Sequence, residues 1–279
     1  MDGASIYATN ANVPEVQGRL GNVVGITEPP AIEARGITKR FGHVEAVRGV
    51  DCVVHAGEVV ALVGDNGAGK STVLSIICGA LAPDTGEVHI FGEALWPPSV
   101  HRAKQLGLEM AYQDLALAPD LSVLENVFMG NELLRKGWIG KFGWLDRKSM
   151  AARADTDIRR LGVSLPSMQL PIFELSGGQR QVVAIARAAM WAKRAILLDE
   201  PTAALGVKQS GLVGEIIRAS ADDGLAVLVV SHDVERILKL ADRVVVLRQG
   251  SVVMETATSS LTLEVVVRAM LGGGKESEM

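Results

Sequence analysis

Apolar and polar positions along the chain repeat with two periods, which divide it into strands and helices. Short runs rich in β-branched residues, such as residues 58–63 and 225–230, have the length of buried strands. Segments with apolar residues at every third or fourth position, such as residues 121–129, are typical of helices with one buried face. The pattern predicts strands at 32–38, 50–54, 58–63, 87–92, 107–113, 195–200 and 225–230, a hairpin at 243–254, and helices at 73–81, 121–129, 146–161, 176–189, 207–221 and 261–271.

The order of these elements indicates an α/β fold. Strands and helices alternate after residue 175, and such alternation implies right-handed crossovers and a parallel sheet covered on both faces. The first two strands have the pattern of an antiparallel pair, with residues 39–43 between them. Residues 1–30 show no steady period and end at two prolines, so we expect a poorly ordered extension, with a partner-binding arm as the alternative.

A glycine-rich loop between strand 58–63 and the following helix carries the clearest chemistry. Its glycines let backbone N–H groups turn inward at the positive end of the helix, which favours a bound phosphate. Lys70 can reach the β- and γ-phosphates, and the Ser71 hydroxyl can ligate Mg²⁺. A glycine-rich turn that binds nothing is the alternative. The predicted phosphate-binding residues are Gly64, Asp65, Asn66, Gly67, Ala68, Gly69, Lys70, Ser71 and Thr72.

Polar residues that follow other predicted strands are candidates for the same site. Asp199 and Glu200 end an apolar strand, where Asp199 would support Mg²⁺ and Glu200 could polarise an attacking water. Gln113 could contact the metal or the water, and His232 could donate a hydrogen bond to a phosphate. Phe41 could offer its ring to adenine. Each has a simpler alternative: a surface loop for the acids, and structural roles for Gln113, His232 and Phe41.

A second anion site is predicted where the helix at 176–189 begins. Its sequence is Ser176-Gly177-Gly178-Gln179, which combines a capping serine with two glycines and exposed N–H groups at the positive helix end. Two phosphate sites in one chain, separated by a helical segment, are hard to reconcile in a monomer. We therefore expect a head-to-tail dimer in which each nucleotide lies between the glycine loop of one chain and residues 176–179 of the other.

Composition excludes several classes of protein. The net charge of −4 offers no electrostatic case for binding nucleic acid or anionic lipid by the chain as a whole. The two cysteines, Cys52 and Cys78, are too few for a disulfide framework or metal site, so we expect buried thiols. No apolar run approaches the roughly 20 residues of a membrane span. The first residues do not have the pattern of a secretion signal, so we expect a cytoplasmic protein.

A stretch rich in glycine and aromatic residues, 136–144, lies between two predicted helices. Its aromatic side chains have two interpretations, namely local packing, which we favour, and contact with another subunit.

The ordered set from Phe41 to His232 resembles the ATP-binding cassette (ABC) family over about residues 31–255. By this resemblance residues 175–179 match the signature motif, Gln113 the Q-loop and His232 the switch histidine, and Asp199 and Glu200 match the Walker B acid and the catalytic carboxylate. The implied fold is a P-loop NTPase of ABC type, with a mostly parallel core sheet, an antiparallel β subdomain and a helical subdomain at about 114–187. Residues 256–279 would form a C-terminal helix and a frayed tail.

Residues 112–117, 121–130 and 202–207 resemble the ATPases of bacterial monosaccharide importers of the ribose, xylose and fructose types. The resemblance implies ATP and Mg²⁺ as cofactors, a membrane permease and a solute-binding protein as partners, a homodimer, and a place on the inner face of the membrane. Import of another solute, action on nucleic acid or ribosomes, and a regulatory subunit without turnover are the alternatives. Two departures are Gly206, where many cassettes carry aspartate, and one cassette where most such importers have two.

Overall fold

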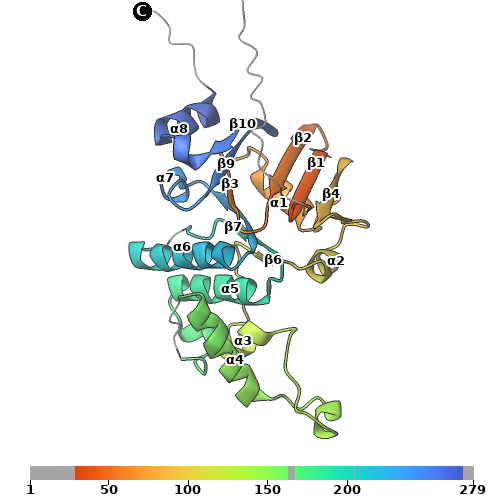
Figure 1. Ribbon diagram of the computed structural model, residues 1–279, viewed down its shortest axis with the longest axis vertical. Coiled ribbons are helices and arrows are strands. Elements are labelled where there is room, and N and C mark those ends of the chain that lie inside the picture. Colours follow the sequence, from red (N-terminus) through yellow and green to blue (C-terminus); the bar gives the residue numbers. More distant parts are fainter. Residues whose placement is uncertain (1–28, 163–166, 204, 273–279) are drawn as a thin grey trace, which may run out of the picture.

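The computed structural model describes residues 29–162, 167–203 and 205–272 as two sheets and a helical lobe (Figure 1). The predicted extension at 1–30 lies outside the described residues except for its last two positions, and the predicted tail at 275–279 also lies outside them. The two sheets pack side by side with helices around them, and the helical lobe extends away from them (Figure 1).

A six-stranded sheet forms the centre, and its strand order is β10-β9-β3-β8-β7-β6. The pairs from β9 to β6 are parallel, and only β10 runs antiparallel to its neighbour β9. The predicted mostly parallel sheet is therefore confirmed, as is the hairpin turning at Gln249 and Gly250. The strands are β3 (Val59–Gly64), β6 (Leu108–Ala111), β7 (Ala195–Asp199), β8 (Ala226–Ser231), β9 (Arg243–Arg248) and β10 (Ser251–Ala257).

An antiparallel sheet of four strands, ordered β2-β1-β4-β5, packs beside the central sheet. It contains β1 (Ile32–Phe41), β2 (Val44–Val54), β4 (Thr85–Ile90) and β5 (Glu93–Ala94). The expected connection at residues 39–43 is wrong, because β1 and β2 continue into a tight hairpin in which Phe41 pairs with Val44. Asp84 favours this extension, since its carboxylate accepts bonds from Lys39 Nζ and the Arg40 backbone N–H, at 2.8 and 2.7 Å.

Helices cover the central sheet and build the lobe. The helix after the glycine loop begins at Lys70, three residues earlier than predicted, because the carbonyl of Gly69 already accepts a bond from the N–H of Val73. The short elements α2, α7 and β5 were not predicted from the sequence. The helices are α1 (Lys70–Ile77), α2 (Val100–Gln105), α3 (Val123–Phe128), α4 (Arg147–Arg160), α5 (Gly177–Trp191), α6 (Val207–Asp222), α7 (Val234–Ile237) and α8 (Leu263–Leu271).

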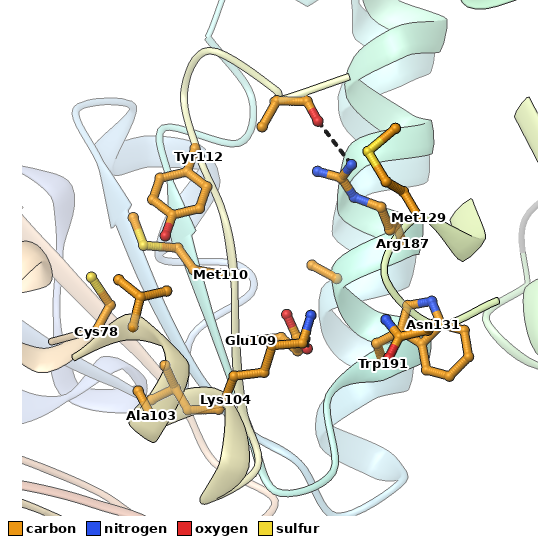
Figure 2. A pocket seen from close by; sticks show the side chains of 14 residues that line it. Cys78, Ala103, Lys104, Glu109, Met110, Tyr112, Met129, Asn131, Arg187 and Trp191 are labelled. Carbon is orange, nitrogen blue, oxygen red and sulfur yellow. Dashed lines mark hydrogen bonds and ion pairs between the residues drawn. The ribbon is translucent and has the colours of Figure 1, made fainter. Parts of the chain in front are cut away.

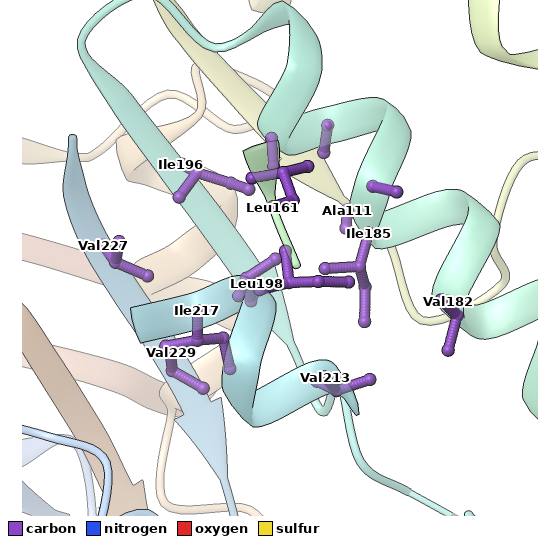
Figure 3. Close-up of a cluster of buried hydrophobic side chains, with 14 of the residues drawn as sticks. Ala111, Leu161, Val182, Ile185, Ile196, Leu198, Val213, Ile217, Val227 and Val229 are labelled. Carbon is purple, nitrogen blue, oxygen red and sulfur yellow. The ribbon is translucent and has the colours of Figure 1, made fainter. Parts of the chain in front are cut away.

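Each face of the central sheet packs against its own apolar cluster. Ile196 and Leu198 of β7 point to one cluster with side chains of α5 and α6 (Figure 3). Leu197, between them, belongs to a second cluster formed with α1 and the antiparallel sheet. Strand side chains alternate between the faces, so a strand buried on both sides has to be apolar throughout. This explains the continuous apolar runs that predicted these strands.

Both cysteines are buried and unpaired with each other, as the sequence predicts. Burial raises the pKa of the Cys52 thiol to about 12 and also raises the pKa of the Cys78 thiol. Among the helices in the described part of the chain, none combines the length and the apolar character needed to cross a bilayer.

The aromatic residues of the 136–144 stretch are exposed, so the favoured interpretation of local packing is wrong. Trp138, Phe142 and Trp144 leave most of their surface open to solvent. The stretch stands at the far end of the helical lobe (Figure 1). Glycine and lysine make up five of the nine residues of this stretch, so few apolar neighbours are available in the sequence to cover the rings.

The buried side chain of Asn126 in α3 binds the backbone of the loop that leads into the helical lobe. Its Oδ1 accepts the N–H of Ala118 at 2.7 Å, and its Nδ2 lies 3.0–3.2 Å from the carbonyl oxygens of Ala118, Leu121 and Ser122. The side chain is fully buried, so these bonds replace water for the loop at 118–122.

We expect Asn126→Ala to lower the free energy of unfolding by about 1–3 kcal/mol, because it leaves buried backbone groups without partners. Urea denaturation followed by circular dichroism measures this change. Asn131→Ala, at a partly exposed asparagine nearby, is the control and should cost less than about 0.5 kcal/mol. Equal effects of the two substitutions would contradict the role given to Asn126.

Candidate functional site

The glycine-rich loop connects β3 to α1 and encloses the side chain of Lys70. Lys70 is buried, and its ammonium group donates hydrogen bonds to the carbonyl oxygens of Gly64 at 2.8 Å and Asp65 at 3.0 Å. The loop thus holds a positive charge beside the N-terminus of a helix. Both features attract a phosphate group.

Two of the loop glycines are required by the backbone that packs around them. A β-carbon at Gly64 would lie 2.3 Å from the carbonyl oxygen of Leu247 in β9, and one at Gly69 would lie 2.3 Å from that of Ala46 in β2. Gly69 also has a φ of 103°, which disfavours other residues. The loop therefore depends on both sheets for its shape, a packing role that its sequence pattern does not reveal.

A cavity of about 510 Å³ opens above this loop and brings most of the predicted site residues together. Phe41, Gln113, Glu200 and His232 all contribute to its wall, although they lie far apart in the sequence. The sheet order explains the meeting of Gln113, Glu200 and His232, because β6, β7 and β8 end at the same edge as β3. Phe41 comes from the end of β1 in the antiparallel sheet. Asp199, Gly64 and Asp65 are not in the wall, which comprises Phe41, Ala46, Asn66, Gly67, Ala68, Gly69, Lys70, Ser71, Thr72, Gln113, Glu200, Ala203 and His232.

Glu200 and His232 form a pair at the end of β7 and β8. The Oε2 atom of Glu200 lies 2.7 Å from Nδ1 of His232 and also accepts the backbone N–H of His232 at 3.3 Å. Glu200 has a φ of 49°, which is unusual for a residue with a side chain. Its backbone N–H donates to the carbonyl of Val230. This strained conformation and the bonds to His232 fix the carboxylate in place at the cavity wall.

The residues predicted as a second anion site begin helix α5 as expected but lie apart from the cavity. Ser176 caps the helix, with Ser176 Oγ accepting the N–H of Gln179 and Gln179 Oε1 accepting the N–H of Ser176. A β-carbon at Gly178 would lie 2.8 Å from Cγ of Gln209 on α6, so this glycine also allows the two helices to meet. Within one chain the structure does not bring residues 176–179 to the wall around Lys70.

Comparison with models of protein families matches residues 47–203, more than half of the chain, to the family described as ABC transporter. The chain belongs to the ABC transporter family. The matched range contains Gln113 and Glu200, whereas Phe41 and His232 lie outside it. The family resemblance proposed from the motifs is thereby confirmed.

Curated relatives of this ABC family chain include import proteins of similar length. It is 39% identical to a fructose import ATP-binding protein of Rhizobium meliloti, with 90% of this chain and 97% of the relative covered. It is 38% identical to a xylose/arabinose import ATP-binding protein of Sulfolobus acidocaldarius, with 86% and 93% covered. A ribose import ATP-binding protein of Rubrobacter xylanophilus is 41% identical over 90% of this chain, which spans only 48% of that relative.

Solved structures of ABC cassettes share the fold. A cassette of an ABC transporter in its ADP conformation has a TM-score of 0.72 at 25% identity, with 88% of this chain and 99% of that chain covered. A dimeric cassette in a post-hydrolysis state, bound to ADP and Pi, has a TM-score of 0.69 at 27% identity, with 82% and 100% covered. The predicted fold class of an ABC-type P-loop NTPase is confirmed.

The environment of Asp199 in this ABC family chain fits a divalent cation. Its Oδ1 atom is buried and has no hydrogen-bond partner. Burial, and then the charge of Glu200, raise the pKa of Asp199, while the ammonium of Lys70 lowers it. No group of three or more histidine, cysteine or acidic residues in the described ranges could hold a metal. A cation here would therefore combine Asp199 with neutral oxygens, which Ser71 and Gln113 can supply.

A second cavity, which the sequence did not predict, lies between the central sheet and the helical lobe (Figure 2). It has a volume of about 260 Å³ and is lined by residues of α2, β6, α5 and the end of α3. We call it the interlobe groove. Lys104 and Glu109 form an ion pair of 3.1 Å on its wall. Only the three-dimensional meeting of these elements creates the groove, so no local motif marks it.

Arg187 connects the interlobe groove to the loop that carries Gln113. The guanidinium donates to the carbonyl oxygens of Leu115 at 3.0 Å and Ala116 at 2.8 Å. Leu115 and Ala116 both have positive φ angles, so these bonds hold a strained turn. The only sign of this contact in the sequence is that Arg187 interrupts a series of apolar residues in α5.

We expect Asp199→Asn to raise the melting temperature of the nucleotide-free protein at neutral pH. The raised pKa means that the ionised carboxylate destabilises the fold above the unfolded pKa near 4. The difference in melting temperature between the two proteins should shrink as the pH falls, because Asp199 becomes protonated in both the folded and the unfolded state. Scanning calorimetry at several pH values measures it.

Addition of MgCl₂ with ATP should raise the melting temperature of the original protein more than that of the Asp199→Asn variant, because the cation needs the carboxylate. The original protein should then have the higher melting temperature. Asp222→Asn, at an exposed aspartate of α6, is the control and should respond as the original protein does. An Asp199→Asn variant that gains as much stability as the original would contradict the metal assignment.

Proposed function

We propose that the chain is the ATP-hydrolysing subunit of an importer that drives monosaccharide uptake through a membrane permease. One observation carries this proposal: the cavity that joins the phosphate loop to Gln113, Glu200 and His232 occurs in a chain about 40% identical to fructose and xylose/arabinose import ATP-binding proteins over nearly their whole length.

The glycine-rich loop would hold the phosphates of ATP. Lys70 would move from the carbonyls of Gly64 and Asp65 to the phosphate oxygens, exchanging two neutral acceptors for charged ones. Phe41, half-exposed at the cavity wall, would offer its ring to the adenine. Mg²⁺, held by Ser71, Asp199 and Gln113, would offset negative charge on the phosphate oxygens when bound.

Glu200 would orient and polarise the water that attacks the γ-phosphate. Its carboxylate is mostly covered, and His232 holds one of its oxygens, so the other oxygen is available to accept a proton from water. His232 is exposed at the cavity wall. With both ring nitrogens protonated, it would donate Nδ1–H to Glu200 and Nε2–H to the phosphate. Because His232 contacts both partners, its loss should affect turnover more than nucleotide binding.

Residues 176–179 would complete the site from a second copy of the chain. Support comes from their position, since they start α5, where Ser176 and Gly177 are exposed, but do not line the cavity of their own chain. A head-to-tail homodimer would place two nucleotides between the chains. Gly206, which begins α6 and lies beside Gln209, would face the partner without a carboxylate.

The interlobe groove is the site we assign to the permease, because it lies between the lobe at about residues 114–187 and the rest of the cassette at 31–255. The chain would then be peripheral on the cytoplasmic face of the membrane and would act indirectly with a solute-binding protein. Residues 256–279 would form a C-terminal addition. With a net charge of −4, we expect no nucleic-acid partner.

We expect Glu200→Gln to lower the ATPase rate by at least about a hundredfold, because the amide cannot accept a proton, while ATP binding remains. Phosphate release and fluorescent ATP titration measure the two effects. A dimer should also accumulate with Mg-ATP and be detected by size-exclusion chromatography. Lys70→Ala should instead lose ATP binding, and Glu215→Gln, an exposed glutamate on α6, should behave as the original. Near-normal turnover of Glu200→Gln would refute its role.

We expect cells that carry Lys70→Ala in place of the original chain to lose uptake of a labelled pentose or hexose, because the permease receives no energy. Uptake of labelled ribose, xylose, fructose and a set of amino acids, compared between the two strains, tests the solute class. Loss of amino acid uptake with normal sugar uptake would overturn the assignment to sugars but leave the ATPase intact.

A further inference from the structure

An arm formed by residues 133–145 projects from the helical lobe at the opposite end of the molecule from α8 (Figure 1). Backbone bonds close its base: the N–H of Arg135 donates to the carbonyl of Trp144 at 2.9 Å, and that of Asp146 donates to Leu133 at 2.7 Å. Leu134 and Leu145 form an isolated antiparallel bridge between these bonds. The base is therefore fixed, and its tip is held away from the rest of the protein.

Three large aromatic side chains of this arm face solvent. Trp138, Phe142 and Trp144 are 73%, 75% and 63% exposed. Trp138 and Phe142 contact each other edge to face, with ring centroids 6.2 Å apart, so the rings are arranged before any partner binds. Gathered aromatic exposure of this kind marks a contact surface in a soluble chain.

The charge of the arm is opposite to that of the whole chain. Arg135, Lys136 and Lys141 lie on it, and no acidic residue occurs between Glu132 and Asp146. The three basic side chains are exposed, on a protein whose net charge is −4. The surface that fits this arm is therefore negatively charged and accepts aromatic rings.

We propose that the arm binds the surface of a membrane that contains anionic phospholipids. Tryptophan favours the boundary between headgroups and acyl chains, and lysine and arginine beside it are attracted to the lipid phosphates. A protein partner is less well matched, because Trp138, Phe142 and Trp144 line none of the described cavities, and none of those cavities offers a groove beside the rings to receive a partner's side chain. The arm inserts rings to headgroup depth and does not cross the bilayer.

The position of the arm agrees with this assignment. It follows directly after Asn131, which lines the interlobe groove. If a permease occupies that groove, which rests on the proposed function, the arm begins two residues from the contact with a membrane-embedded partner. The chemistry of the arm itself does not depend on the permease or on ATP hydrolysis.

The test measures binding of the full-length purified chain to vesicles by co-sedimentation at low and at moderate salt. Vesicles of phosphatidylcholine alone are compared with vesicles that also contain phosphatidylglycerol. We expect binding to the anionic vesicles only, weakening as the salt rises because the attraction of exposed charges is screened. No binding to anionic vesicles at low salt would overturn the proposal.

Three variants locate the binding. A variant that combines Trp138→Ala, Phe142→Ala and Trp144→Ala should bind anionic vesicles at least about tenfold more weakly. A variant that combines Lys136→Gln and Lys141→Gln should lose about fivefold for each lysine. The control is Trp96→Ala, which removes an equally exposed tryptophan outside the arm, between β5 and α2, at 73% exposure, and should bind as the original does.

The ATPase rate and melting temperature of the same variants separate the arm from the cassette. We expect the ATPase rate to stay at the original value, since no arm residue lies at the nucleotide cavity. The melting temperature should also stay unchanged, because the substituted side chains are exposed. Anionic-vesicle binding that survives the triple substitution would overturn the proposal. If the triple variant binds vesicles normally and sugar uptake is nevertheless lost, the arm binds a protein partner and the proposal is overturned. If the unsubstituted chain shows no ATPase activity, that result counts against the proposed function and not against membrane binding by the arm.

Discussion

β3 lies between β8 and β9 in parallel register, and this arrangement determines where every candidate site residue can lie. All three strands run in one direction, so their following loops meet at one edge of the sheet. The loop after β3 can hold its shape only because Gly64 and Gly69 let it approach the carbonyls of Leu247 and Ala46. Contact between the two sheets is thus part of the nucleotide cavity itself.

The interior of the fold and the candidate site residues at this edge could be predicted from the sequence, because both depend on patterns of residues that are close together in the chain. A strand buried on both faces must be apolar throughout, as β7 and β8 are, and a phosphate loop needs glycine at particular positions. The hairpin at Gln249 and the cap at Ser176 followed for similar reasons. Each depends on residues that are neighbours in the chain.

Other features depend on contacts between distant segments and escaped prediction. The strained turn at Leu115 and Ala116 exists because Arg187, more than 70 residues later, holds its carbonyls. Extension of β1 to Phe41 depends on Asp84. The exposure of Trp138 could not be inferred, because an aromatic residue near glycines is equally compatible with packing. The prediction that residues 176–179 of a second chain meet the cavity came from the sequence, and it stays a prediction because a single chain does not bring them there.

The burial of both cysteines protects their thiols from oxidation. The thiolate, not the thiol, reacts with peroxide or disulfides, and at neutral pH Cys52, with a pKa of about 12, is almost never a thiolate. Cys78 borders the interlobe groove, yet burial raises its pKa as well. Oxidation at these two cysteines is therefore disfavoured while the chain is folded, and the segments that carry them need no disulfide to hold their place.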